Sequence, residues 1–195
     1  MLSCVESGPT VLRVVLATGD EMAGEVEVWL RGPIPGVPEP LQPVAHALLQ
    51  ALEEVGAIAA DLPDELLWTR PGGVASAGFH LRHMSGVVDR LFTYARGEKL
   101  DDHQLLVLRG ETDPPATPVS AVELAAAFGL QVEGAVEVLR RMDEATLAQP
   151  RAVGRKALPS TVRGLLFHAA EHVQRHLGQL IVTVRVQRAD EGSQP

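Results

Sequence analysis

The sequence has few of the residues that form disulfide frameworks, thiolate metal centres or basic nucleic-acid surfaces. Cys4 is the single cysteine among 195 residues, which excludes an internal disulfide and a cysteine-rich metal site. Acidic residues outnumber lysine and arginine by 25 to 17, the net charge is −8, and there is no long basic run. Because phosphate binding needs clustered basic side chains, we expect no nucleic-acid partner.

Long apolar runs are also missing. No segment approaches the roughly 18 uninterrupted apolar residues that a membrane-spanning helix requires. The N-terminus lacks a positively charged leader region, and Arg13 interrupts the apolar stretch from Val11 to Leu16, so no signal peptide is expected. We therefore expect a soluble, cytoplasmic protein with no membrane partner, whose 46% hydrophobic residues suffice for a sizeable core.

Apolar residues recur at helical spacing in four segments separated by proline-marked breaks. The spacing predicts helices over about 41–61, 74–96, 120–142 and 160–188. The third has the best start, since Ser120 and Glu123 fit a capping box. These segments predict an all-α fold, a four-helix bundle. The connection over 98–118 is long enough for a crossover between the second and third helices, and it is expected to hold a short helix near 103–108.

The remaining segments are predicted to flank the bundle. Residues 1–39 form an N-terminal extension and linker, with a short helix or strand within 11–30 and five prolines over 31–43, which exclude a continuous helix there. Residues 40–188 form the bundle itself. Residues 189–195 are predicted to be a flexible tail.

Five of the seven histidines lie in two short clusters, His80 with His83 and His168 with His172 and His176. Residues four apart share one face of a helix, so two such imidazoles can bind one metal ion at about 2.0–2.1 Å. His168 and His176 lie about 12 Å apart along the helix axis, so all three cannot bind the same ion. The spacing predicts one i, i+4 pair plus a third ligand from the first cluster. It does not decide whether that pair is His168–His172 or His172–His176.

A competing motif overlaps the second cluster. His168, Glu171 and His172 spell H-x-x-E-H, in which two histidines bind zinc and the glutamate is a general base. Such sites take a third ligand from well downstream, and only 23 residues follow His172, so this reading is disfavoured. The isolated His46 and His103 are interpreted as ordinary structural histidines.

Three other positions near these clusters are given structural roles. Asp89 and Arg90 are expected to cap or pair at the bundle surface, and Gly178 to let two helices approach closely.

No dedicated general base is evident, because Glu171 points about 100° away from the adjacent His172 on the helix.

The two clusters resemble those of the DinB/YfiT-like metalloenzyme superfamily. Its usual pattern has a histidine near the start of the second bundle helix and an H-x-x-x-H-x-G-Q element on the fourth. Residues 83–85, HMS, match the first element, and residues 172–179, HVQRHLGQ, match the second. Trp68 and Pro71 also resemble the family's approach to the second helix.

This resemblance implies which histidines act together. His83, His172 and His176 are implied as ligands of a divalent metal ion. Further residues are expected behind the ligands or in the pocket: His80, His168 and Gln179. The family also implies a four-helix bundle that is frequently dimeric, so a homodimer is expected.

Three neutral imidazoles leave a divalent ion with an open position for water or substrate. Zinc is the first choice, and nickel, manganese or iron are also compatible with such ligands. Relatives include enzymes that use low-molecular-weight thiols such as mycothiol or bacillithiol. The resemblance therefore implies a metal-dependent thiol transferase or hydrolase acting on a small-molecule substrate. The alternative is a non-catalytic metal-binding or stress-associated interaction protein with the same bundle.

Overall fold

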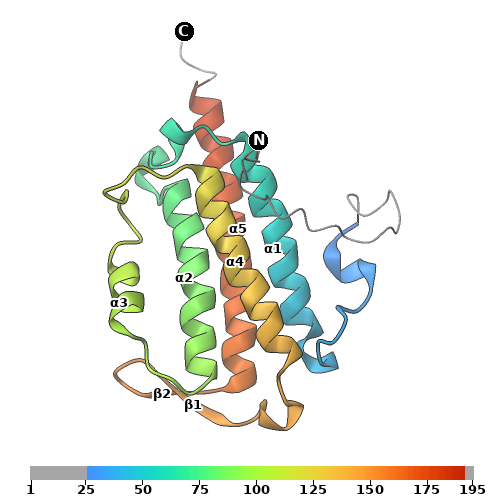
Figure 1. Cartoon of the computed structure of the whole chain (residues 1–195). Coiled ribbons are helices and arrows are strands. Elements are labelled where there is room, and N and C mark those ends of the chain that lie inside the picture. Colours follow the sequence, from blue (N-terminus) through green and yellow to red (C-terminus); the bar gives the residue numbers. More distant parts are fainter. Residues whose placement is uncertain (1–25, 192–195) are drawn as a thin grey trace, which may run out of the picture.

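The computed structural model describes residues 26–191 and shows a bundle of four long helices with one short helix on its outside (Figure 1). The helices are α1 (Gln42–Asp61), α2 (Ala77–Ala95), α3 (Asp102–Arg109), α4 (Ala121–Arg140) and α5 (Val162–Glu191). Short 3-10 helices span Val28–Arg31, Glu39–Leu41, Asp64–Leu66, Pro71–Gly73 and Glu144–Thr146. This confirms the predicted all-α bundle and the short helix in the long connection. Within residues 26–191, no helix is both long enough and apolar enough to cross a membrane.

The two ends of the described chain differ from the predicted boundaries. The short helix or strand expected within 11–30 falls mostly outside the described residues, which include only the 3-10 helix Val28–Arg31 of that segment. At the other end, α5 continues to Glu191, so residues 189–191 of the expected tail are helical, and residues 192–195 lie outside the described residues.

The order of the helices around the bundle differs from their order in the chain. Both α1 and α2 pack against α4 and α5, so the consecutive helices α1 and α2 lie on a diagonal. In Figure 1, α2 and α4 run in the same direction, and the chain between them returns along the outside of α2 with α3 on it. The predicted crossover between the second and third long helices is therefore confirmed.

Local hydrogen bonds define several helix starts. Ser120 and Glu123 form the predicted reciprocal capping box of α4, and Asp101 with Gln104 forms a second one at α3. The Oγ1 of Thr161 accepts a hydrogen bond from the Gly164 N–H at 3.0 Å, in the first turn of α5.

The break predicted over 150–159 contains an element that the sequence analysis missed. Two short strands, β1 (Pro150–Val153) and β2 (Leu158–Thr161), pair in antiparallel register, with Val153 opposite Leu158. The Arg151 Nε donates to the Ala95 carbonyl at 2.7 Å, so the hairpin is attached to the end of α2. Strands of four residues are too short for a recognisable alternation of polar and apolar residues.

The core lies between the four long helices and is filled by fully buried side chains, including Leu48, Phe128, Leu166 and Leu180. The helix contact predicted at Gly178 is wrong, because a Cβ there would lie within 4 Å of no other helix among the described residues. Instead, α2 packs extensively against α5, and His83, His172 and His176 lie in this contact.

Candidate metal centre

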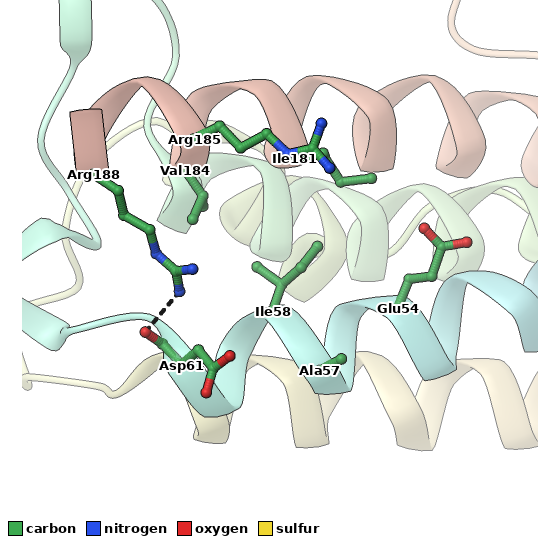
Figure 2. A pocket seen from close by; sticks show the side chains of 8 residues that line it. All are labelled: Glu54, Ala57, Ile58, Asp61, Ile181, Val184, Arg185 and Arg188. Carbon is green, nitrogen blue, oxygen red and sulfur yellow. Dashed lines mark hydrogen bonds between the residues drawn. The ribbon is translucent and has the colours of Figure 1, made fainter. Parts of the chain in front are cut away.

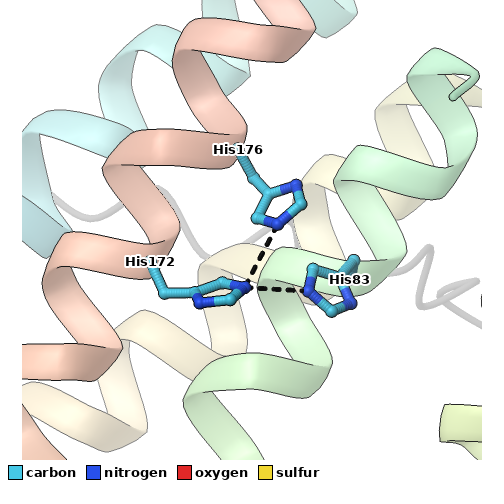
Figure 3. A group of neighbouring side chains, drawn as sticks. All are labelled: His83, His172 and His176. Atoms are coloured by element: carbon cyan, nitrogen blue, oxygen red, sulfur yellow. Dashed lines mark hydrogen bonds between the residues drawn. The ribbon is translucent and has the colours of Figure 1, made fainter. Parts of the chain in front are cut away.

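The ring nitrogens of three histidines from two helices converge between α2 and α5 (Figure 3). The Nε2 of His172 lies 3.1 Å from the Nε2 of His83 and 3.1 Å from the Nε2 of His176. All three side chains are partly buried. The structure thus brings together the three histidines that the family resemblance implies.

These contacts fit a cation better than they fit hydrogen bonds among the three rings. A ring nitrogen presents either one hydrogen or one lone pair, so the His172 Nε2 cannot make good hydrogen bonds to both neighbours. A cation accepts a lone pair from each ring at once. In tetrahedral zinc sites with bonds of 2.0–2.1 Å, the ligand nitrogens lie about 3.3 Å apart. The three histidines therefore fit a divalent metal ion such as zinc.

Each ring has different surroundings at its Nδ1. The Nδ1 of His83 lies 2.7 Å from the Oε2 of Glu111, and the Nδ1 of His176 lies 3.0 Å from the Nδ1 of His80. The Nδ1 of His172 is buried and has no hydrogen-bond partner in the described part of the chain. Two of the three rings are therefore held by partners behind them.

Burial keeps several of these imidazoles neutral. Desolvation, reinforced by the neighbouring His83, lowers the pKa of His176 to about 3 and that of His80 to about 4. The same causes lower the pKa of His172. These three rings are therefore neutral at neutral pH, each with one protonated and one unprotonated ring nitrogen. A metal ion would not have to compete with a positively charged form of His172 or His176.

Phe79, one turn before His83 on α2, packs against the rings. Its ring is stacked on that of His83, with centroids 5.1 Å apart and an interplanar angle of 16°. It also meets His80 and His176 edge-on. These contacts limit the rotation of the His80, His83 and His176 rings. Phe79 also borders a cavity of about 360 Å³ that is lined by Arg70, Ser76 and Thr112, among others.

Glu111, which follows α3, was not predicted from the sequence to contact the triad. Its side chain is buried, and its Oε1 lies 2.5 Å from the Nη1 of Arg90. Arg90 does pair, but the predicted location at the bundle surface is wrong, because the α2–α4 connection covers this face of α2 and Arg90 is only 8% exposed. The neighbouring Asp89 accepts a hydrogen bond from Gln104 of α3 instead.

Gly86 is the feature of the sequence that could have indicated the buried Arg90–Glu111 pair. A Cβ at Gly86 would lie 2.3 Å from both the Arg90 Nη1 and the Glu111 Oε1. Glycine is unfavourable inside a helix, so its presence four residues before an arginine indicates that space is needed there.

The remaining predicted residues lie further from the centre of the triad. His168 is exposed, its ring meets that of His172 edge-on, and its Nδ1 lies 3.1 Å from the Oε2 of Glu171. Gln179 is exposed, and its side chain makes no hydrogen bond within the described residues. His46 Nε2 contacts the Gly32 carbonyl at 2.9 Å, which supports its structural interpretation.

The H-x-x-E-H group is also compact, since donor atoms of His168, Glu171 and His172 lie within 4.8 Å of one another. However, Glu171 already pairs with Arg175 as well as His168, and His168 is exposed. The group shares His172 with the triad, so the two arrangements compete for one ring. The triad provides three imidazoles and greater burial.

A separate groove between α1 and α5 contains no histidine (Figure 2). It has a volume of about 340 Å³, and the Nη2 of Arg188 donates to the Asp61 carbonyl across it at 2.9 Å. Its walls combine Ile58, Ile181 and Val184 with charges of both signs.

The fold and the converging histidines define a four-helix-bundle protein with a candidate metal centre between two facing helices. A model of the DinB superfamily matches residues 44–180, and the chain belongs to this superfamily. The crystal structure described as the conserved protein of locus from Enterococcus faecalis has a TM-score of 0.57 to this chain, at 19% identity. The similarity covers 75% of this chain and 95% of that one, and it supports the fold alone. No curated protein matches the chain.

Proposed function

We propose that this DinB-superfamily protein binds one divalent metal ion through His83, His172 and His176 and is a metal-dependent enzyme. The observation that carries the proposal is that three Nε2 atoms from two different helices converge. The His172 Nε2 lies 3.1 Å from each of the other two. Zinc is the first choice, with nickel, manganese or iron as alternatives. The proposed reaction class is transfer by a low-molecular-weight thiol, or hydrolysis, on a small-molecule substrate.

The chemistry follows from the donor set. A divalent ion held by three imidazoles would lower the pKa of a bound water or thiol and polarise an electrophile at its open position. The protein's own contribution is to hold the rings. Phe79 and Glu111 restrain His83, and His80 supports His176. The His83 side chain is 17% exposed, so solvent or substrate can reach this side of the triad.

The alternative is a non-catalytic metal-binding or interaction protein, and one observation favours it. Both carboxylates near the triad already have partners. Glu111 pairs with Arg90 and His83, and Glu171 pairs with His168 and Arg175. Neither is free to act as a general base, so proton transfer would depend on the bound nucleophile or on the substrate's own groups.

Metal content tests the ligand assignment. Protein purified without a histidine tag or chelating column is expected to contain close to one equivalent of a divalent metal. Replacing any of the three ligand histidines by alanine should sharply reduce it, whereas His46→Ala and His103→Ala should not. One equivalent in all three ligand variants would refute the site. Metal loss in His168→Ala but not in His176→Ala would instead assign the ion to the H-x-x-E-H group.

Cobalt substitution separates an enzyme from a scaffold. A thiol that displaces an exchangeable water binds as thiolate and should change the visible spectrum of the cobalt protein. The change should persist in His103→Ala and be lost in His176→Ala. A cobalt spectrum that does not respond to thiols or small anions would indicate a closed site, and the non-catalytic alternative would then be favoured.

A further inference from the structure

The backbone around Glu111 is held on α2 by an arginine. The Nη1 of Arg82 donates to the carbonyl oxygen of Gly110 at 2.5 Å and to that of Asp113 at 2.7 Å. These two carbonyls lie on either side of Glu111. A segment without regular secondary structure is thereby held in one position against the helix that carries His83.

The Glu111 side chain points inward from this anchored turn. It is 2% exposed, whereas its neighbour Thr112 is exposed. A buried carboxylate is costly unless it is paired and hydrogen-bonded, and Arg90 provides the compensating charge at 2.5 Å. The space for this pair exists because residue 86 is glycine.

The second oxygen of the carboxylate faces His83. An ionised carboxylate only accepts hydrogen bonds, so at 2.7 Å the His83 Nδ1 must carry the hydrogen. A neutral imidazole with its hydrogen on Nδ1 has its lone pair on Nε2, the atom that faces His172. Carboxylates behind metal-binding histidines commonly act in this way.

We propose that Glu111 is a positioning residue that selects the Nδ1–H tautomer of His83 and so directs its Nε2 lone pair into the triad. Arg90 and Gly86 are the parts of α2 that hold the carboxylate in place. The tautomer is a property of the metal-free protein. Only the expected effect on metal affinity rests on the proposed function.

Glu111→Gln distinguishes this role from a merely structural one. Glutamine has the same shape, but its amide has one accepting and one donating end. Because Arg90 can only donate, the amide oxygen should face Arg90 and the NH₂ group should face His83. The His83 Nδ1 must then accept, which moves the ring hydrogen to Nε2 and aims it at the triad. An equivalent carboxylate-to-amide change in serine proteases also produces the wrong histidine tautomer.

The test is nitrogen NMR of the histidine side chains in metal-free protein, followed by titration with zinc. In the native chain, His83 should show the hydrogen on Nδ1, and Glu111→Gln should move it to Nε2. Zinc affinity of the variant should fall about 10- to 100-fold. Glu171→Gln is the matched control, because it makes the same change at a carboxylate that pairs with His168 and Arg175. It should leave the His83 tautomer unchanged and the affinity within a few-fold.

The tautomer measurement and the zinc titration can fail separately. A hydrogen on Nε2 of His83 in the native chain, or an unchanged tautomer in Glu111→Gln, would overturn the role of Glu111. If Glu111→Gln does not fold, the tautomer in the native chain decides the question. If the native chain binds no metal, the proposed function fails, but the tautomer measurement still supports or overturns this inference.

Discussion

Replacing Gly86 by alanine should destabilise the protein, although alanine normally strengthens a helix. Gly86 lies in the middle of α2 beside the Arg90–Glu111 pair. A Cβ there would lie 2.3 Å from one atom of each partner, whereas ordinary van der Waals contacts are 3.4–4 Å. Both atoms would have to move by about 1 Å. Both are also buried, so movement separates the two charges without exposing them to water.

Two opposing contributions determine the size of the effect. Disrupting a buried ion pair costs about 3–5 kcal/mol when a charge is left without its partner. Replacing glycine by alanine inside a helix stabilises by about 1 kcal/mol. The net expected loss is therefore about 2–4 kcal/mol in the free energy of unfolding. At a slope of about 2 kcal/mol per molar urea, the unfolding midpoint should fall by about 1–2 M.

The assay is urea unfolding of the metal-free protein, followed by circular dichroism. Gly134→Ala is the matched control, because Gly134 is exposed in α4 and a Cβ there would have no neighbour within 4 Å in residues 26–191. This control should raise stability by up to about 1 kcal/mol. If Gly86→Ala were as stable as the native chain, the pair would tolerate the added methyl group, and the reasoning about Gly86 would be wrong.

Two further predictions concern pH and assembly. The folded pKa of His80 is about 4 and an unfolded histidine titrates near 6.5, so between these values only the unfolded state gains the proton. Stability should be complete above pH 6.5 and decline as the pH falls toward 4, and urea midpoints for His80→Asn should depend less on pH. We also predict that the protein is a homodimer, which light scattering would measure. Val182 and Val186 form an exposed apolar strip on α5 that suits a dimer interface. Val182→Glu should then give a monomer, and a monomeric native chain would contradict this expectation.

Local features of the sequence were sufficient for the helices. Apolar spacing placed the four long helices within a few residues of their observed bounds, because a buried stripe is a property of neighbouring turns. The capping box of Ser120 and Glu123 was predicted because its partners are three residues apart. The hairpin at 150–161 was missed, because its short strands depend on pairing and on the adjacent end of α2.

The composition of the site was only partly encoded in local spacing. An i, i+4 pair was predictable from helix geometry, but spacing alone did not decide between His168–His172 and His172–His176. That choice depends on how α5 is rotated against α2, which side-chain packing along the whole contact determines. The family resemblance implied the observed set, and metal binding by that set stays a prediction.

Glu111 shows most clearly what only the tertiary structure decided. It lies 28 residues after His83, in a segment whose composition resembles an exposed loop. Its burial follows from the crossover, which brings the chain back along α2, and from Arg82, which anchors the turn there. Periodicity describes only contacts between residues a few positions apart. The partner of a metal-binding histidine can come from any distance along the chain, so only the folded arrangement of α2 and its covering segment identifies it.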